Sequence, residues 1–168
     1  MPKADRLQNC VEPALQAARR AGPRLVYARD DASGSGLSSG KPPRILIVED
    51  DVLVAGEMEL ELAAAGFDVV GVATSAEDAI RLAREEKPHV TVMDIRLEGE
   101  RDGIEAATEI FRSLGIRSLF VSAFHDPETR RRAEPSAPLG WLPKPYSMNS
   151  LVDAVRSALR NLGYAESS

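Results

Sequence analysis

The sequence predicts an α/β domain built on a doubly wound sheet of five parallel strands. Three observations support this fold class. From residue 44 onward, short apolar runs alternate with amphipathic helical patterns, and the connections between them are short. The first run is also apolar at every position, as expected for a strand that helices cover on both faces. Five such strand–helix units imply a parallel sheet with helices on both sides.

Five apolar runs are expected to form the strands. The first reads ILIV, and the third leads directly into Asp94. The runs occupy residues 45–48, 69–72, 90–93, 119–121 and 139–142.

Apolar residues at helical spacing follow each of the first three strands. The stripes consist of Val54, Met58 and Leu62, then Ile80 and Ala83, then Ile104, Ala107, Ile110, Phe111 and Leu114. Ser75 and Asp78 approximate a capping box at the start of the second helix. Gly66 and Gly115 are placed to end the first and the third helix.

The fourth and fifth helices are expected to differ in length. Asp126 as N-cap and Pro127 at the first helical position start the fourth helix. Pro135 and Pro138 then leave it only about two turns. The fifth helix carries a longer apolar stripe, which consists of Leu151, Val152, Val155, Leu159 and Leu162.

The chain is expected to divide into three segments. Residues 1–43 form an N-terminal arm and flexible linker, because residues 32–40 read ASGSGLSSG and two prolines follow shortly after. Residues 44–162 form the globular domain, and residues 163–168 form a C-terminal tail. Residues 1–43 carry seven basic and four acidic side chains, whereas residues 44–168 carry 14 basic and 22 acidic ones.

Composition argues against several classes of function. The formal net charge of -5 gives no clustered basic face for nucleic acid. No run approaches the roughly 18 apolar residues of a membrane helix, and the N-terminus lacks a signal-peptide pattern. Cys10 is the only cysteine, so we expect a reducing compartment and a cytoplasmic protein.

Polar residues stand where four of the five strands end. Glu49 and Asp50 follow the first strand, Asp94 ends the third, Ser122 ends the fourth and Lys144 follows the fifth. Ligands bind outside the carboxyl ends of parallel strands, and clustered carboxylates need a cation to stay ionised. Mg²⁺ favours such oxygen ligands together with phosphate oxygens. Carboxylates can also accept phosphoryl groups.

Residues 44–162 resemble the receiver domain of two-component signalling, the fold of the chemotaxis response regulator. ILIVEDD matches the family's first strand and acidic cluster, and VTVMDIRL matches the strand that carries the phosphoryl acceptor. VSA matches the hydroxyl residue and its small neighbour, and WLPKPY matches the lysine–proline segment. The resemblance implies a flavodoxin-like (βα)5 fold with strand order 2-1-3-4-5 and, here, a shortened fourth helix.

The resemblance also implies roles for the acidic residues. Asp94 is the phosphoryl acceptor toward a phosphohistidine. Asp50 and Asp94 are direct ligands of Mg²⁺ (or Mn²⁺), Glu49 is a ligand through water, and the backbone carbonyl of Arg96 is a further ligand. Asp51 has two interpretations, a helix cap or a metal ligand, and the cap is favoured.

The remaining site residues act on the phosphoryl group or respond to it. By resemblance, Lys144 pairs with the phosphoryl oxygens, Ser122 hydrogen-bonds one of them, and Pro145 follows a cis peptide bond. Trp141 stands at the position of the family's switch aromatic, with an ordinary half-buried ring as the alternative. Phe124 replaces a side chain that is polar in many members, so we expect slow loss of the phosphoryl group.

These features predict a single-domain response regulator rather than an enzyme with an external substrate. Its phosphoryl donor is a sensor histidine kinase or a histidine phosphotransfer protein, and its output is contact with an unidentified downstream protein. The oligomeric state stays open between a monomer and a weak homodimer. The alternatives are a Mg²⁺-dependent phosphohydrolase with an aspartyl-phosphate intermediate and a scaffold that is never phosphorylated.

Overall fold

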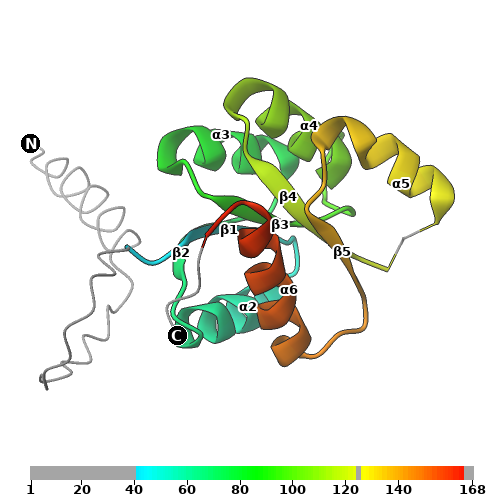
Figure 1. The fold of residues 1–168 in the computed structure, drawn as a ribbon. Helices are drawn as coiled ribbons and strands as arrows, with labels where there is room; N and C mark the ends of the chain where they lie inside the picture. The colour runs from blue at the N-terminus through cyan, green and yellow to red at the C-terminus, as the bar shows by residue number, and fades with distance from the viewer. Residues whose placement is uncertain (1–40, 124–125, 165–168) are drawn as a thin grey trace, which may run out of the picture. The chain divides into compact units, whose positions relative to one another are not determined.

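The computed structural model describes residues 41–123 and 126–164, which contain one five-stranded parallel sheet (Figure 1). Its strand order is β2-β1-β3-β4-β5, which confirms the predicted topology. The strands are β1 (Arg44–Val48), β2 (Asp68–Ala73), β3 (Val90–Asp94), β4 (Arg117–Ser122) and β5 (Gly140–Pro143). The last strand begins one residue later than the sequence predicts. The predicted N-terminal arm lies almost wholly outside the described residues, so the division near residue 43 stays a prediction.

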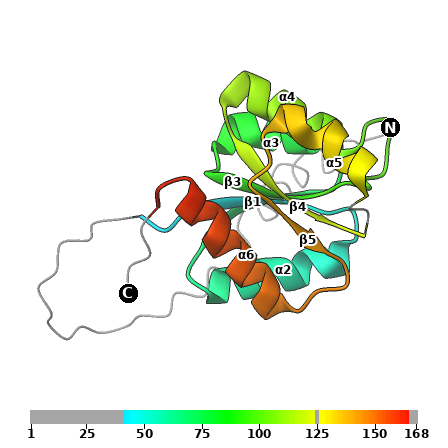
Figure 2. The ribbon, with the colours of Figure 1, turned by 45° about the vertical axis from the view of Figure 1, so that its right-hand side comes forward.

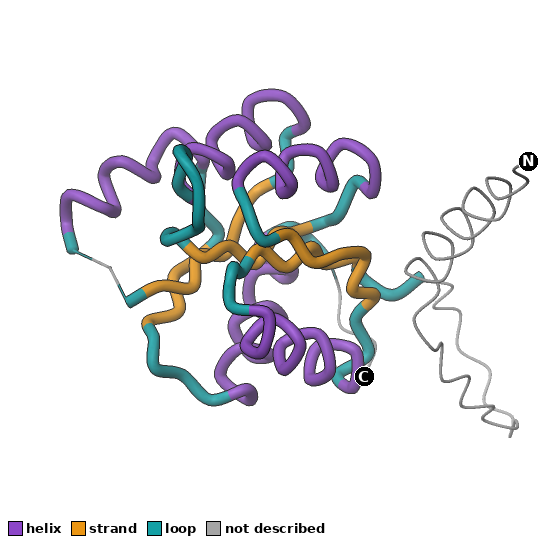
Figure 3. The backbone as a smooth tube through the Cα atoms, turned by 180° about the vertical axis from the view of Figure 1, so that it is seen from behind, coloured by secondary structure: helices purple, strands orange, loops and turns teal. Residues whose placement is uncertain are grey.

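Helices cover both faces of the sheet (Figures 1 and 3). Helices α2 (Val52–Ala64) and α6 (Met148–Asn161) pack on one face. The other face is covered by α3 (Ala76–Glu86), α4 (Gly103–Leu114), α5 (Pro127–Ala133) and the 3₁₀ turn η1 (Glu134–Ser136). The part of the chain that the structure describes includes no helix long and apolar enough to cross a membrane.

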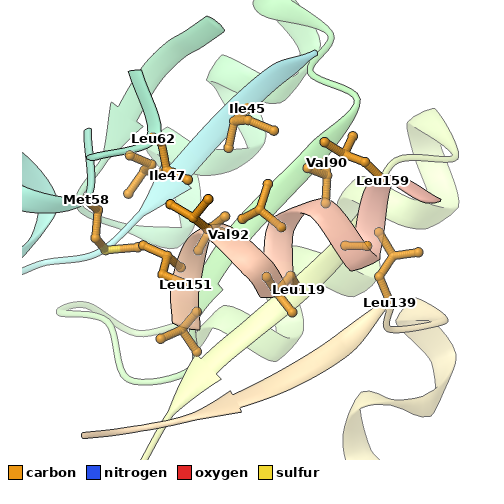
Figure 4. Packing of buried hydrophobic residues seen from close by; sticks show 14 of the residues in the cluster. Ile45, Ile47, Met58, Leu62, Val90, Val92, Leu119, Leu139, Leu151 and Leu159 are labelled. Carbon is orange, nitrogen blue, oxygen red and sulfur yellow. The ribbon is translucent and has the colours of Figure 1, made fainter. Parts of the chain in front are cut away.

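The alternation of side chains along β1 divides the core into two layers. Ile45 and Ile47 point toward α2 and α6, whereas Leu46 and Val48 point toward α3 and α4. All four side chains are buried, which explains why this strand is apolar at every position. Figure 4 shows the first layer, in which Ile45 and Ile47 lie among Leu62, Val92 and residues of α6.

Helix ends follow the sequence signals in most cases. Ser75 accepts a hydrogen bond from the backbone N–H of Asp78 (3.2 Å), but the Asp78 carboxylate pairs with Arg81, so the predicted capping box is only half formed. The complete capping box is at α4, where Asp102 and Glu105 each accept the other's backbone N–H at 3.0 Å. This second pair was not predicted from the sequence.

The fourth helix of the predicted series is short, as expected. Asp126 caps α5 through the N–H groups of Glu128 and Thr129, and Pro127 is its first residue. After seven residues the chain continues as η1. Arg132 of α5 forms an ion pair with Asp102 Oδ2 at 2.5 Å, so α5 is connected to the N-cap of α4.

His89 is a structural residue, and it gives the fold a dependence on pH. Its Nδ1 accepts the backbone N–H of Arg44 at 2.8 Å, and burial followed by the charge of Arg44 lowers the His89 pKa. The folded state therefore binds this proton more weakly than the unfolded chain, whose histidine has a pKa of about 6.5. The resulting stability is complete above that value and is lost as the pH falls toward the folded pKa.

We therefore expect His89→Asn, which retains a side-chain acceptor, to make the free energy of unfolding depend less on pH below neutrality. Urea unfolding between about pH 7 and about pH 5 should show that the unmodified protein loses more stability than the variant. Parallel profiles for the two proteins would contradict the assignment.

Candidate functional site

Three carboxylates converge at the carboxyl edge of the sheet. Glu49 and Asp50 directly follow β1, and Asp94 is the last residue of β3, the strand beside it. One oxygen from each residue lies within 4.8 Å of the other two. Glu49 is only 3% exposed and Asp94 only 7%, so these charges are held close together in a largely dry environment.

Lys144 places its ammonium group between two of these carboxylates. Its Nζ donates to Asp94 Oδ2 and to Glu49 Oε2, each at 2.7 Å. The residue follows β5, and its backbone N–H donates to the carbonyl of Ser122 at 3.1 Å. The peptide bond between Lys144 and Pro145 is cis, as the sequence analysis expects.

The pKa shifts reflect this crowding. Burial raises the Glu49 pKa more than its hydrogen bond to Lys144 lowers it, and the nearby Asp94 raises it further. For Lys144, burial alone would lower the pKa. The hydrogen bonds to Asp94 and Glu49 outweigh that effect, and the Lys144 pKa lies above its usual value. Lys144 is therefore charged at neutral pH and offsets part of the negative charge.

The backbone around Asp94 is held by the chain that follows it. Asp94 Oδ1 accepts the N–H of Arg96 at 3.1 Å, and the N–H of Gly103 donates to the carbonyl of Ile95 at 2.8 Å. Gly103 is buried so tightly that a Cβ there would overlap the carbonyl oxygen of Asp94 and lie 2.9 Å from its carbonyl carbon. Gly103 was not predicted from the sequence, although the Asp-Gly pair at a helix start is a signal for it.

Ser122 and Trp141 lie on the two strands beyond Asp94. Ser122 is the buried last residue of β4 and pairs with Pro143 of β5. It directly follows Val121, which pairs with Asp94 of β3. Trp141 is half-buried, stacks on Phe120 with ring centroids 4.8 Å apart, and has the Arg130 guanidinium 5.3 Å from its ring. Phe124 lies outside the described residues.

Asp51 serves as a helix cap. Its carboxylate accepts the N–H groups of Leu53 and Val54 at 2.9 and 3.3 Å, at the start of α2. It is not part of the carboxylate cluster formed by Glu49, Asp50 and Asp94. The geometry agrees with the favoured interpretation of this residue.

Tyr146, which the sequence predicts to share with Trp141 an apolar face that could dimerise, has an unexpected feature in its hydroxyl. Its hydroxyl is buried and finds no hydrogen-bond partner among the described residues, and burial raises its pKa. Because an unpaired buried hydroxyl opposes folding, we expect Tyr146→Phe to raise the free energy of unfolding by about 1 kcal/mol. Urea denaturation measures this, with Tyr164→Phe at a more exposed position as the control. A loss of stability would show instead that the hydroxyl is hydrogen-bonded, for example to water.

Comparisons with known proteins agree on one family. Residues 45–156 match the model of the response regulator receiver domain. The transcriptional regulatory protein PdtaR of Mycobacterium tuberculosis is 32% identical over 70% of this chain and 57% of its own length. The phyllosphere-induced regulator PhyR of Methylorubrum extorquens is 28% identical over 77% of this chain and 48% of its own. The chain therefore spans about half the length of the curated relatives it matches.

A solved structure shows the same arrangement. The signal receiver domain of a modulated diguanylate cyclase from Desulfovibrio desulfuricans G20 superposes with a TM-score of 0.65 at 33% identity. The match covers 71% of this chain and 95% of that one. The fold therefore has a counterpart in a solved receiver domain of similar sequence.

Proposed function

The chain belongs to the response regulator receiver family, a family of signalling proteins, and from that premise we propose that it accepts a phosphoryl group on Asp94. The donor is a sensor histidine kinase or a histidine phosphotransfer protein, and the phosphorylated domain signals by contact with another protein. The observation that carries this proposal is the Lys144 ammonium group, 2.7 Å from both Asp94 and Glu49.

The chain's own contributions to the proposed transfer all lie at this edge of the sheet. A carboxylate oxygen of Asp94 forms a bond to phosphorus while the bond from phosphorus to the donor's imidazole nitrogen breaks. That nitrogen keeps the electron pair of the broken bond, and the ring, whose other nitrogen carries a proton, leaves as neutral imidazole. The product on this chain is an acyl phosphate at Asp94. Lys144 moves from the carboxylates to the new phosphoryl oxygens, and the Ser122 hydroxyl donates to one of them.

The carboxylate cluster also fits a divalent cation. Its donor set is all oxygen, its members lie within 4.8 Å of one another, and Lys144 alone does not balance their charge. Asp50 and Asp94 would hold Mg²⁺ or Mn²⁺ directly, with Glu49 through water and the carbonyl of Arg96 as a further ligand. When bound, the ion neutralises negative charge on the phosphoryl oxygens.

Acetyl phosphate tests the proposal without a protein donor. With Mg²⁺ present, intact-mass spectrometry should show the gain of one phosphoryl group by the unmodified chain and none by Asp94→Asn. Asp51→Asn, an acid-to-amide change at a carboxylate outside the cluster, should still be labelled. Label on Asp94→Asn would place the acceptor elsewhere, and an unlabelled unmodified chain would support the scaffold alternative. Turnover of small phosphate esters, tested separately, would support the phosphohydrolase.

Trp141 offers an optical test of the signalling step. We propose that occupation of Asp94 shifts Ser122 and, through it, the packing of Trp141 against Phe120 and Arg130. Because Trp141 is the only tryptophan, beryllofluoride with Mg²⁺ should change the intensity or the wavelength of its emission. Asp94→Asn should show no change, and an unaltered spectrum in the unmodified protein would assign Trp141 a static role.

A further inference from the structure

A groove of about 650 Å³ follows helix α4. The end of α3 forms one of its walls, and α5 with η1 forms the other. Figure 2 shows these helices beside one another on the same face of the sheet. The volume falls within the range of small-molecule sites, roughly 300–1,000 Å³. None of the residues that line the groove belongs to the site around Asp94, so the groove is a candidate for a second site.

The groove concentrates positive charge in a domain whose acidic side chains outnumber its basic ones. We call it the arginine groove, because four arginines from separate segments line it: Arg84 of α3, Arg101 of the loop before α4, Arg112 of α4 and Arg132 of α5. Glu105 and Glu109 line it as well, and Asp102 pairs with Arg132 beside it. Four positive charges therefore face three negative ones.

Two of the arginines already hold an anionic group between them. Arg84 donates to Glu109 Oε1 at 2.9 Å, and Arg101 donates to Glu109 Oε2 at 2.8 Å. The hydrogen bond from Arg101 lowers the Glu109 pKa. Because a guanidinium has several N–H donors and each arginine uses one of them on Glu109, further donors remain for a second anion. The pair thus forms a clamp for an anion with several oxygens.

Arg112 supplies a positive charge at the other end of α4. It lies in the last turn of the helix and is exposed. Within residues 41–123 and 126–164 it forms no ion pair, unlike the other three arginines of the groove. Since Arg101 precedes the first turn of α4, the uncompensated cation and the clamp approach the groove from opposite ends of the helix. A ligand that uses both needs more than one anionic group.

We infer that the arginine groove binds a small phosphorylated compound that carries at least two phosphoryl groups. One group takes the place of the Glu109 carboxylate between Arg84 and Arg101, and another pairs with Arg112. A phosphoryl group has more charge and more acceptor oxygens than a carboxylate, and the planar fork of arginine matches it. A nucleic acid strand fits less well, because the acidic domain around the groove repels a long polyanion. The inference does not depend on phosphorylation of Asp94.

Pyrophosphate is the probe for this inference. It is titrated into the ¹⁵N-labelled full chain at constant ionic strength with EDTA present, so that no divalent cation recruits phosphate to the carboxylate cluster around Asp94. Resonances of α4 and of the end of α3 should shift, and pyrophosphate should bind roughly tenfold or more tightly than orthophosphate or citrate, a tricarboxylate of similar charge. Its affinity should fall as salt is added. Equal binding of citrate, shifts that avoid the groove, or no binding at millimolar pyrophosphate would overturn the inference.

Substitutions of single charges complete the test. Arg84→Gln and Arg112→Gln should each weaken pyrophosphate roughly tenfold, whereas Glu109→Gln, which removes the competing carboxylate, should strengthen it several-fold. Arg131→Gln is the matched control, because Arg131 is an exposed arginine of α5 outside the groove, and it should leave binding unchanged. Equal losses in Arg131→Gln and Arg112→Gln would show attraction to net charge alone and would also overturn the inference. Urea unfolding checks that each variant is folded, and labelling by acetyl phosphate with Mg²⁺ reports separately on the proposed function.

Discussion

Replacing Gly103 by alanine is expected to destabilise the domain by about 3 kcal/mol or more, because the added methyl group would have to displace backbone rather than side chains. The new Cβ would overlap the carbonyl oxygen of Asp94 and lie 3.1 Å from the Cα of Ile95. Helix propensity alone predicts the opposite, since alanine favours a helix over glycine by about 1 kcal/mol. The sign of the measured change in the free energy of unfolding therefore separates the two effects.

Gly56→Ala is the matched control for this prediction. The same substitution on the exposed side of α2 meets no atom within 4 Å, so it should stabilise the protein by about 1 kcal/mol. Urea unfolding of both variants measures their free energy of unfolding. Labelling by acetyl phosphate reports whether Asp94 in each variant still accepts a phosphoryl group. A Gly103→Ala protein with full stability and full labelling would show that the segment between β3 and α4 relaxes freely.

Replacing Lys144 by methionine is the second change with a large expected effect. The side chain keeps its approximate length, but Glu49 and Asp94 lose the cation that lies 2.7 Å from each. Removal of one partner from a buried ion pair costs about 3–5 kcal/mol. Lys144 is partly exposed, so we expect the lower end of that range at neutral pH.

The pH dependence of this deficit identifies its cause. Burial already raises the Glu49 pKa with Lys144 present, and removal of the ammonium group leaves Glu49 more easily protonated. Since the folded variant then binds this proton more readily than its unfolded chain, its stability relative to the unmodified protein should recover as the pH falls toward the range in which Glu49 is protonated. Added Mg²⁺ should restore stability at neutral pH in the same variant. A deficit that neither acid nor Mg²⁺ reduces would point to lost packing rather than to unbalanced charge.

The sequence was sufficient for features that depend on local pattern. The unbroken apolar run of β1 indicated a strand buried on both faces, and Asp126 with Pro127 marked the first residues of α5 correctly. The polar residues at the strand ends could be grouped because parallel strands bring their carboxyl ends to one edge. That rule is enough to group Glu49, Asp50 and Asp94 in one cluster.

Features that depend on distances between separate segments were not predictable in this way. Gly103 matters because α4 begins against the carbonyl of Asp94; the Asp102-Gly103 pair marks a helix start, but the close approach depends on how two separate segments pack. The unpaired hydroxyl of Tyr146 depends on which side chains surround it. The side of α2 that faces solvent looked like an ordinary helical pattern, because only the packing of Met58 and Leu62 on the sheet shows which apolar residues remain outside.

The ion pair between Arg132 and Asp102 has a mechanical consequence. Asp102 holds the first turn of α4 with one carboxylate oxygen and Arg132 of α5 with the other. Gly103, the next residue, abuts the carbonyl of Asp94. The carboxylate of Asp102 therefore links α5 directly to the start of α4, which lies against the strand that carries the acceptor, and raised ionic strength should loosen that linkage before it loosens the core.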